Sequence, residues 1–335
     1  MRGALDLQFC LWNKIPALFV RVMKEIPMTG EFSARPLPLV VIAALFALTV
    51  TSGARAAERT FRRSFSVGKT VRLSLDSHTG SVNVIAGDSG EIRVIADVRG
   101  RDKDVRDFDI SAAQSGDEVS VRGVLREEGT WVWYSPRLSV SFTIRVPREC
   151  GLKLKTGEGW ISVDGVRGVL KGRTSTGDIT LALTQGNATL ETRSGSVRAD
   201  SCGGTLDLST SGGGAYINHV DGDVDVSTSA GDVTITDVTG SIRAQTEGGN
   251  MVLSLTGPNR GIHAESSGGD IRISLPLRDS GDIDAEATGG EVVCAFPGHL
   301  EGTVHADEID ARLNGGGSPI FAHTQGGSVR IGPGN

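Results

Sequence analysis

Glycines that recur every 18 residues constrain the fold of this 335-residue chain more than any other feature. Two glycine series, offset by nine residues, keep this period without a slip, and a column of threonines runs in register with them. The first series is Gly159, Gly177, Gly195, Gly213, Gly231 and Gly249, the second is Gly168, Gly186, Gly204, Gly222 and Gly240, and the threonines are Thr156, Thr174, Thr192, Thr210, Thr228 and Thr246. Self-similarity at a fixed short period is typical of a solenoid, in which each repeat stacks on the next.

The residues that follow each glycine alternate between apolar and polar, as at Leu206 and Leu208 or at Val233 and Ile235. A period of two predicts a strand with one buried face, and two such strands per 18 residues leave enough chain for two tight turns. The expected fold is an all-β solenoid with 18-residue coils and two short strands per coil, similar to a parallel β-helix or β-roll. Glycines are expected where φ is positive or where the chain passes close to its neighbour.

Two further columns have predicted structural roles. The threonine column has the same parity as the inward aliphatic residues, so its hydroxyls are expected to satisfy backbone groups of the turns. A second column is expected to form an apolar corner, and it consists of Val166, Thr184, Cys202, Val220 and Val238. The outward positions are chemically mixed, and they include Lys171, Thr189, Asp207, Asp225, Arg243 and His263.

The repeat pattern also divides the chain into segments. We expect a leader over 1–56, first coils over 57–96, an inserted or capping β segment over 97–149, solenoid repeats over 150–331 and a tail over 332–335. The 97–149 segment departs from the repeat because its apolar stretches are longer and are joined by polar loops. A segment that covers the end of a solenoid would prevent edge-to-edge aggregation.

The leader is predicted from the apolar run Leu37–Val50, whose 14 residues fall short of the roughly 20 that a membrane-spanning helix needs. Arg35 precedes this run, and Ala54 and Ala56 follow it at the two positions that a signal peptidase reads. A start at Met28 would give a leader of ordinary length. We therefore expect export to a periplasm or beyond the cell, with no transmembrane segment after cleavage.

The charge of the chain limits its possible partners, and its cysteine content limits its possible disulfides. Residues 1–56 hold six of the 34 basic and three of the 40 acidic residues, which leaves 28 against 37 in the remaining chain. An acidic surface disfavours nucleic acid as a partner, because binding to phosphates needs basic residues. Three cysteines remain after the leader, Cys150, Cys202 and Cys294, and so low a number predicts no disulfide framework.

A resemblance to a known family is carried by strands that run into Val146-Pro147, then by Leu152–Thr156, and then by the iterated steps Thr174–Leu181 (TSTGDITL) and Thr228–Ile235 (TSAGDVTI). Through these segments the chain resembles the bacterial putative-adhesin domain family, a domain of unknown function. The resemblance covers about residues 70–331. It implies an exported, envelope-associated β-solenoid. The family carries no set of catalytic residues, so the resemblance transfers none to this chain.

The candidate ligand-binding residues are Trp131, Trp133, Tyr134 and Arg137, which lie close together in a chain with few large aromatics. Exposed aromatic rings could stack on sugar rings or anchor a protein partner, with Arg137 nearby for hydrogen bonds. The alternative is that Trp131 and Trp133 share one strand face and cap the end of the solenoid.

The sequence predicts no metal site and no cofactor. Asp221, Asp223 and Asp225 resemble the start of a calcium loop, but the sixth position is Val226 instead of glycine. The histidines occupy different phases of the repeat, whereas a metal site needs convergent ligands. They are His78, His219, His263, His299, His305 and His323.

Two functions follow from these observations. The first is a non-enzymatic, exported, adhesin-like β-solenoid that binds or scaffolds in the cell envelope, with an envelope glycan or protein as its partner. The second is a polysaccharide lyase or hydrolase on a β-helix scaffold, for which Asp223, Asp225, Arg243 and His263 are candidates because they lie on nearby outward positions.

Overall fold

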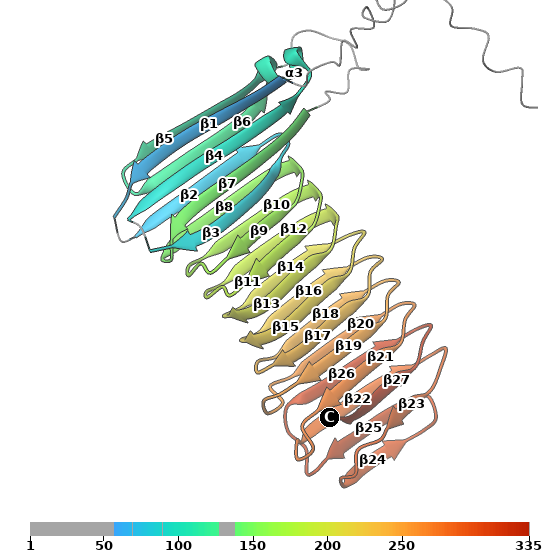
Figure 1. Cartoon of the computed structure of the whole chain (residues 1–335). Helices are drawn as coiled ribbons and strands as arrows, with labels where there is room; N and C mark the ends of the chain where they lie inside the picture. Colours follow the sequence, from blue (N-terminus) through green and yellow to red (C-terminus); the bar gives the residue numbers. More distant parts are fainter. Residues whose placement is uncertain (1–56, 69, 89, 127–137, 335) are drawn as a thin grey trace, which may run out of the picture. The chain divides into compact units, whose positions relative to one another are not determined.

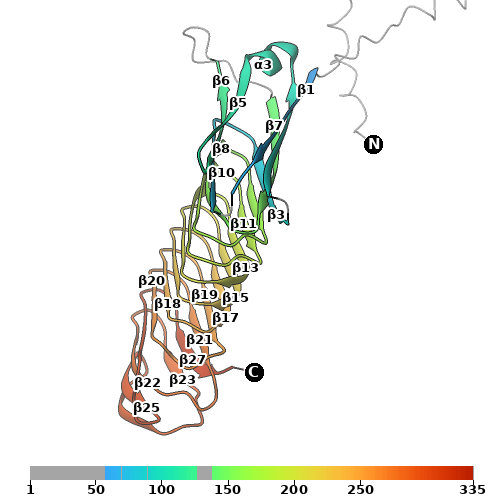
Figure 2. The same cartoon turned by 90° about the vertical axis from the view of Figure 1, so that its left-hand side faces the viewer.

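The computed structural model describes residues 57–68, 70–88, 90–126 and 138–334, all of which fall in a compact unit from Ala56 to Asn335. In these residues the strands form one 13-stranded sheet (sheet A) and one 14-stranded sheet (sheet B), which face each other as two layers (Figures 1 and 2). The expected all-β solenoid is confirmed.

Residues 150–275 form the regular part of the solenoid, in which each coil contributes one strand to each sheet. The strands of sheet B are β8 (Cys150–Glu158), β10 (Leu170–Thr176), β12 (Ala188–Ser194), β14 (Leu206–Thr210), β16 (Val224–Thr228), β18 (Ile242–Thr246) and β20 (Ile262–Ser266). The strands of sheet A are β9 (Ile161–Asp164), β11 (Ile179–Ala182), β13 (Val197–Gly203), β15 (Ala215–Asp221), β17 (Val233–Val238), β19 (Met251–Leu255) and β21 (Ile271–Leu275). Neighbouring strands are parallel and in register, with Leu206 opposite Val224, for example.

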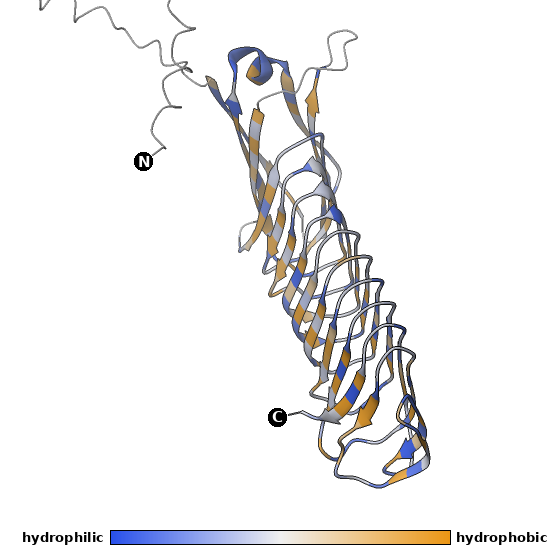
Figure 3. Ribbon diagram, turned by 90° about the vertical axis from the view of Figure 1, so that its right-hand side faces the viewer, coloured by the Kyte–Doolittle hydropathy of each residue, from blue (hydrophilic) through white to orange (hydrophobic). Residues whose placement is uncertain are grey.

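The core lies between the two sheets and is filled by the inward residues of each strand. Leu206, Leu208, Val233 and Ile235 are at most 1% exposed, and apolar and polar residues alternate along the ribbons (Figure 3). The expected apolar corner is also buried, because Val166, Cys202, Val220 and Val238 are all at most 3% exposed and Thr184 is 5% exposed. One coil has no core of its own, so stacking supplies both the burial and the ladder hydrogen bonds.

The glycine columns are required by close backbone approach between coils. A Cβ atom on Gly213 would lie 2.1 Å from the carbonyl oxygen of Gly195, and one on Gly222 would lie 2.1 Å from that of Gly204. Gly222 also has φ +156°, in the region that favours glycine. Each glycine therefore makes room for the glycine of the preceding coil.

The N-terminal end of the unit differs from the regular coils. It contains β1 (Ala57–Ser66), β2 (Val71–Ser77), β3 (Ser81–Gly87), β4 (Glu91–Gly100), helix α3 (Asp102–Asp107), β5 (Phe108–Ser115), β6 (Glu118–Leu125) and β7 (Leu138–Pro147). β2 and β3 stack on β8 and β9, and β6 and β7 stack on β2 and β3 in turn. β4 and β5 then pair antiparallel with β7 and β6.

The first strand differs from the expected segment division. Residues 57–66, which we expected to belong to the first coils, form β1, and β1 pairs antiparallel with β4 at the edge of sheet A. Its Phe61 and Phe65 are half-buried and pack against the core. The outermost strands at this end are therefore antiparallel, because the chain returns directly instead of completing another coil.

The C-terminal end departs from chain order. It contains β22 (Gly281–Ala287), β23 (Val292–Cys294), β24 (Leu300–Val304), β25 (Glu308–Leu313), β26 (Pro319–Thr324) and β27 (Val329–Pro333). β26 lies between β20 and β22 in sheet B, and β27 lies between β21 and β23 in sheet A. The last coil of the chain is thus inserted between two earlier coils, whereas its 18-residue spacing in the sequence gives no sign of this order.

Candidate functional site

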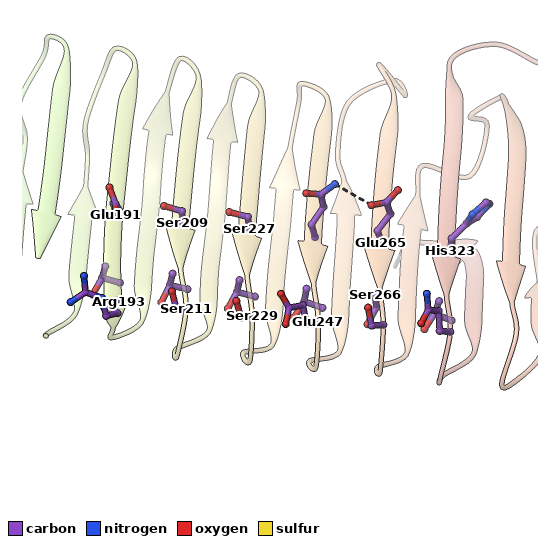
Figure 4. A pocket seen from close by; sticks show the side chains of 18 of the residues that line it. Glu191, Arg193, Ser209, Ser211, Ser227, Ser229, Glu247, Glu265, Ser266 and His323 are labelled. Atoms are coloured by element: carbon purple, nitrogen blue, oxygen red, sulfur yellow. Dashed lines mark hydrogen bonds between the residues drawn. The ribbon is translucent and has the colours of Figure 1, made fainter. Parts of the chain in front are cut away.

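A polar groove of about 790 Å³ runs along the outer face of sheet B and crosses every strand from β10 to β22 (Figure 4). Three columns of residues line it, a middle column of nearly buried threonines and one serine from β10 to β26, and the outward residues on either side of it. At a spacing of about 4.8 Å per strand, the eight strands give a groove about 34 Å long. Because β26 is inserted between β20 and β22, the groove continues without a gap through the C-terminal coils.

The floor of the groove is the threonine column. Each hydroxyl donates a hydrogen bond to the carbonyl of a glycine in the preceding coil, as from Thr210 to Gly195 at 2.8 Å and from Thr228 to Gly213 at 2.9 Å. Ser266 and Thr324 continue the same pattern toward the C-terminal end. The predicted structural role of these hydroxyls is confirmed, and it leaves the floor fixed.

The two walls are formed by the residues that flank each floor residue. The first wall consists of Arg173, Glu191, Ser209, Ser227, Gln245, Glu265, His323 and Glu286, and the second of Ser175, Arg193, Ser211, Ser229, Glu247, Ser267, Gln325 and Thr288. Strand register places each member of the first wall beside the next one. The register of the coils therefore sets the spacing of polar groups along the groove.

The centre of the groove is lined by short hydroxyl side chains. Ser209, Ser211, Ser227 and Ser229 lie side by side there (Figure 4), and their hydroxyls make no hydrogen bond to another described residue. Because serine is small, the walls are lowest here. Four hydroxyls are thus open to a ligand as donors and acceptors.

The two ends of the groove carry opposite charge. Arg173 forms an ion pair of 2.8 Å with Glu191, and Arg193 faces the groove beside them. At the other end lie Glu247, Glu265 and Glu286. Gln245 donates to Glu265 at 3.1 Å, the dashed line in Figure 4.

Histidines and one aromatic ring adjoin the acidic end. His263 stacks on Phe321 with ring centroids 4.5 Å apart, and the ring centroids of Phe321 and His323 lie 3.8 Å apart. The imidazole Nε2 of His323 lies 2.9 Å from a carboxylate oxygen of Asp284. These contacts fix the side chains of the inserted strand β26 against both of its neighbours.

The residues predicted for ligand binding, Trp131, Trp133, Tyr134 and Arg137, lie outside the described residues. The candidate enzymatic set is divided by the structure. Asp225, Arg243 and His263 occupy successive positions of one outward column of sheet B, and Arg243 Nε lies 3.8 Å from an Asp225 oxygen. Asp223 precedes β16 and accepts hydrogen bonds from the backbone N–H and the hydroxyl of Ser241, both at 2.8 Å.

The two carboxylates have opposite pKa shifts. The hydrogen bonds from Ser241 lower the pKa of Asp223. Burial, together with the nearby Asp207, raises the pKa of Asp225, although Arg243 opposes this. Asp223 is therefore a structural acceptor between coils, as Asp178 and Asp232 are for the backbone N–H groups of Ser196 and Asn250.

Cysteines and metal ligands contribute no site within the described part of the chain. Cys150, Cys202 and Cys294 are free thiols there, and burial raises the pKa of Cys150 to about 12. In the same part of the chain, no three His, Cys, Asp or Glu side chains are placed to hold a metal ion. None of its helices is long and apolar enough to cross a membrane, since α3 has six residues.

The stacked coils, with their glycine and threonine columns, lie within the residues that match a known family. Residues 70–331 match the family described as Toastrack DUF4097. The chain belongs to the Toastrack family. The sequence resemblance to a domain family of unknown function over about residues 70–331 is thereby confirmed.

Solved structures with similarity to this Toastrack chain include two proteins named for adhesion. A "putative cell adhesion protein" from Clostridium sporogenes shares 12% identity at a TM-score of 0.22, with 84% of this chain and 100% of that chain covered. A "putative adhesin" from Bacteroides fragilis shares 12% identity at a TM-score of 0.41, with 82% and 97% covered. No curated protein matches the chain.

The groove was not found from the sequence, although a signal for it exists. The residues on either side of each threonine are outward by parity and polar, and they include the four central serines. That pattern shows two polar columns but not the hollow between them. The full length of the hollow also depends on the insertion of β26, which no local pattern encodes.

Proposed function

We propose that this Toastrack protein is an exported, adhesin-like binding module of the bacterial cell envelope, and that its groove on sheet B holds a linear glycan. The observation that carries this proposal is the row of open serine hydroxyls along a groove about 34 Å long. An extended chain of sugars presents hydroxyl groups at a regular interval, and it would lie along the stack of coils, across the strands.

The chemistry of the walls favours a glycan over a folded protein as the partner. Protein interfaces have an apolar, aromatic-rich centre, whereas the centre of this groove is lined by serine and threonine. Serine, glutamine and carboxylate side chains offer both donors and acceptors to sugar hydroxyls. The fixed floor means that little ordering would be needed on binding.

The experiment compares the purified chain from Ala57 with a variant that fills the groove. Ser209→Arg with Ser227→Arg places two long side chains over the centre. The matched control, Ser162→Arg with Ser274→Arg, adds the same charge at outward positions of sheet A. The probes are soluble peptidoglycan glycan strands and a neutral linear glucan, and binding is measured by calorimetry.

We expect binding of at least one probe, a loss of about tenfold or more in the groove variant, and no change in the control. Tenfold corresponds to about 1.4 kcal/mol, the scale of one or two lost hydrogen bonds. Equal binding by the two variants, or binding of neither probe by the unmodified chain, would contradict the proposal.

A second candidate function, polysaccharide cleavage, is supported by one observation. Asp225 has a raised pKa and neighbours both Asp207 and Arg243 in a column next to the groove. A carboxyl group whose pKa is raised beside a second carboxylate is the arrangement that acid–base cleavage of glycosidic bonds uses. Release of new reducing ends that is lost in Asp225→Asn would support cleavage, and intact glycan chains after incubation would support binding alone.

A further inference from the structure

Sheet A carries a second, smaller hollow, on the side of the solenoid opposite the groove. Successive outward positions of its strands are Ser162, Thr180, Arg198, Tyr216, Thr234 and Val252. Most members of this column are small, whereas Tyr216 is large and 39% exposed. A single aromatic residue in such a column interrupts the repeat at one coil.

The coil that contains Tyr216 departs from the repeat at a second position, next to the tyrosine ring. Two residues before this column, Asp178, Asp232 and Asn250 of three other coils each accept a backbone N–H from the next coil. The coil of Tyr216 has Gly214 at that position. A Cβ atom on Gly214 would lie 3.0 Å from Tyr216 Oη and 3.1 Å from its Cε2. Gly214 therefore leaves room for the ring, which leans toward it.

The position of the Tyr216 ring is fixed from a neighbouring coil. The guanidinium carbon of Arg198 lies 4.9 Å from the ring centroid, at the distance of a cation–π contact. Arg198 and Tyr216 together form one wall of the hollow. Because the ring leans toward Gly214, the space on its other side, toward the end of the strand, is open.

The opposite wall is a hydrogen-bonded ladder across three coils. Asn218 Nδ2 donates to Asp200 at 2.9 Å, and the Thr236 hydroxyl donates to Asn218 Oδ1 at 2.8 Å. The bonds from Asn218 and from the Ser201 hydroxyl lower the pKa of Asp200. The wall thus holds an ionised carboxylate, with acceptor sites left over, at a fixed distance from an aromatic ring.

We propose that this hollow binds one neutral pyranose residue, such as the end or a branch of a glycan. Its volume of about 280 Å³ is near the lower limit of small-ligand pockets, a size suited to one sugar ring. The apolar face of the sugar packs on Tyr216, and its hydroxyls donate to Asp200 and accept from Asn218. The carboxylate of Asp200 disfavours an anionic ligand, and the small size disfavours a folded protein.

The experiment uses amide chemical shifts of the isotopically labelled chain from Ala57. The probes are the methyl pyranosides of glucose, galactose, mannose and N-acetylglucosamine, added separately at millimolar concentration. We expect at least one of them to shift the amides of residues 198–200 and 216–218 in a saturable way. These residues lie on sheet A, so the result is independent of the groove on sheet B.

Three variants test the two walls. Tyr216→Ala and Asp200→Asn should each weaken binding by about tenfold, because each removes one of the two kinds of contact. Gly214→Ala keeps the tyrosine but displaces its ring, and it should also weaken binding. The control Val252→Ala changes an equally exposed residue of the same column outside the hollow, and it should leave binding unchanged.

Folding of every variant is checked by its thermal transition, which an exposed side chain should alter little. The proposal is overturned if no pyranoside shifts these amides. It is equally overturned if Tyr216→Ala binds as the unmodified chain does, or if the shifts appear only along the groove of sheet B.

Discussion

The regular coils over 150–275 and the C-terminal coils over 276–334 are built from the same repeat but are assembled in different ways. In the regular coils, a strand pairs with the strand one coil further along the chain, as where Ala188 lies opposite Leu206. In the C-terminal coils, Ile320 pairs with Ile262 and with Ile283, which come 58 and 37 residues earlier. Local contacts can therefore propagate the first region coil by coil, whereas the second region needs the last residues of the chain.

The inserted coil also means that the last strands of the chain are not the outermost strands of the solenoid. β26 and β27 are paired on both sides, so the end of the chain is held within the two sheets (Figure 1). At this end the outermost strands of sheet B are β25 and β24, which run antiparallel to their neighbours, whereas β23, the outermost strand of sheet A, is parallel to β27. An end of this kind differs in register and direction from a coil, which makes stacking of another solenoid on it less favourable.

Deletions within the regular coils should have the largest effect. Removal of residues 204–221 takes out one whole coil, so the flanking coils can stack and the protein should stay folded with slightly lower stability. Removal of residues 204–212 takes out half a coil and sends every later strand to the wrong sheet, so the chain should unfold. Circular dichroism and size-exclusion chromatography distinguish the two outcomes, and equal tolerance of both deletions would contradict the coil assignment.

Truncation after Ser318 should have a smaller effect that is confined to one end. It removes β26 and β27, whose inward residues include Ile320, Val329 and Ile331, and should cost roughly 5 kcal/mol of burial. Hydrogen exchange should show lost protection over 281–313 and retained protection over 150–246. A synthetic peptide of residues 319–335 should restore protection.

The same truncation tests whether the C-terminal coils depend on the inserted strands, as the regular coils do not. If β22 moved over to pair directly with β20, the C-terminal coils would behave as ordinary repeats. Protection over 281–313 would then survive the truncation, and the added peptide would have no effect.

The sequence predicts the regular coils well but does not predict the order of the C-terminal coils. The glycine and threonine columns specified coil length, strand number and the buried face, because these depend on contacts with the next coil. The insertion of β26 could not be predicted, since Ile320, Ala322 and Val329 fit any coil equally well. Of the candidate site, the outward parity of Ser209 and Ser227 was available in the sequence, but the parity of a residue does not show whether its column borders a hollow.

Single glycine substitutions test whether close contact between coils explains the glycine columns of the regular coils. Gly213→Ala places a Cβ atom 2.1 Å from the Gly195 carbonyl oxygen, which the stack cannot relieve without separating two coils. We expect a loss of about 3 kcal/mol in the free energy of unfolding, measured by urea denaturation. Gly212→Ala is the matched control, because its nearest atom would be 3.4 Å away and the chain should tolerate it. A similar cost at both positions would mean that contact between coils does not explain the glycines, because the lower entropy of the unfolded chain with alanine would by itself favour folding.

The smallest expected effect concerns one corner of the regular coils. These coils place Leu183, Ser201, His219 and Asp237 in the left-handed region, with φ between 52° and 58°, and the equivalent residue of the preceding coil is Gly165, with φ 73°. Leucine is costly there, and the side chain of Leu183 is 62% exposed, so it gains little by burial. Leu183→Asn should therefore raise the free energy of unfolding by about 1 kcal/mol, because asparagine tolerates this conformation. Leu183→Ala keeps the Cβ atom and should give no such gain, so an equal gain in both variants would assign the effect to the lost side chain and not to the backbone.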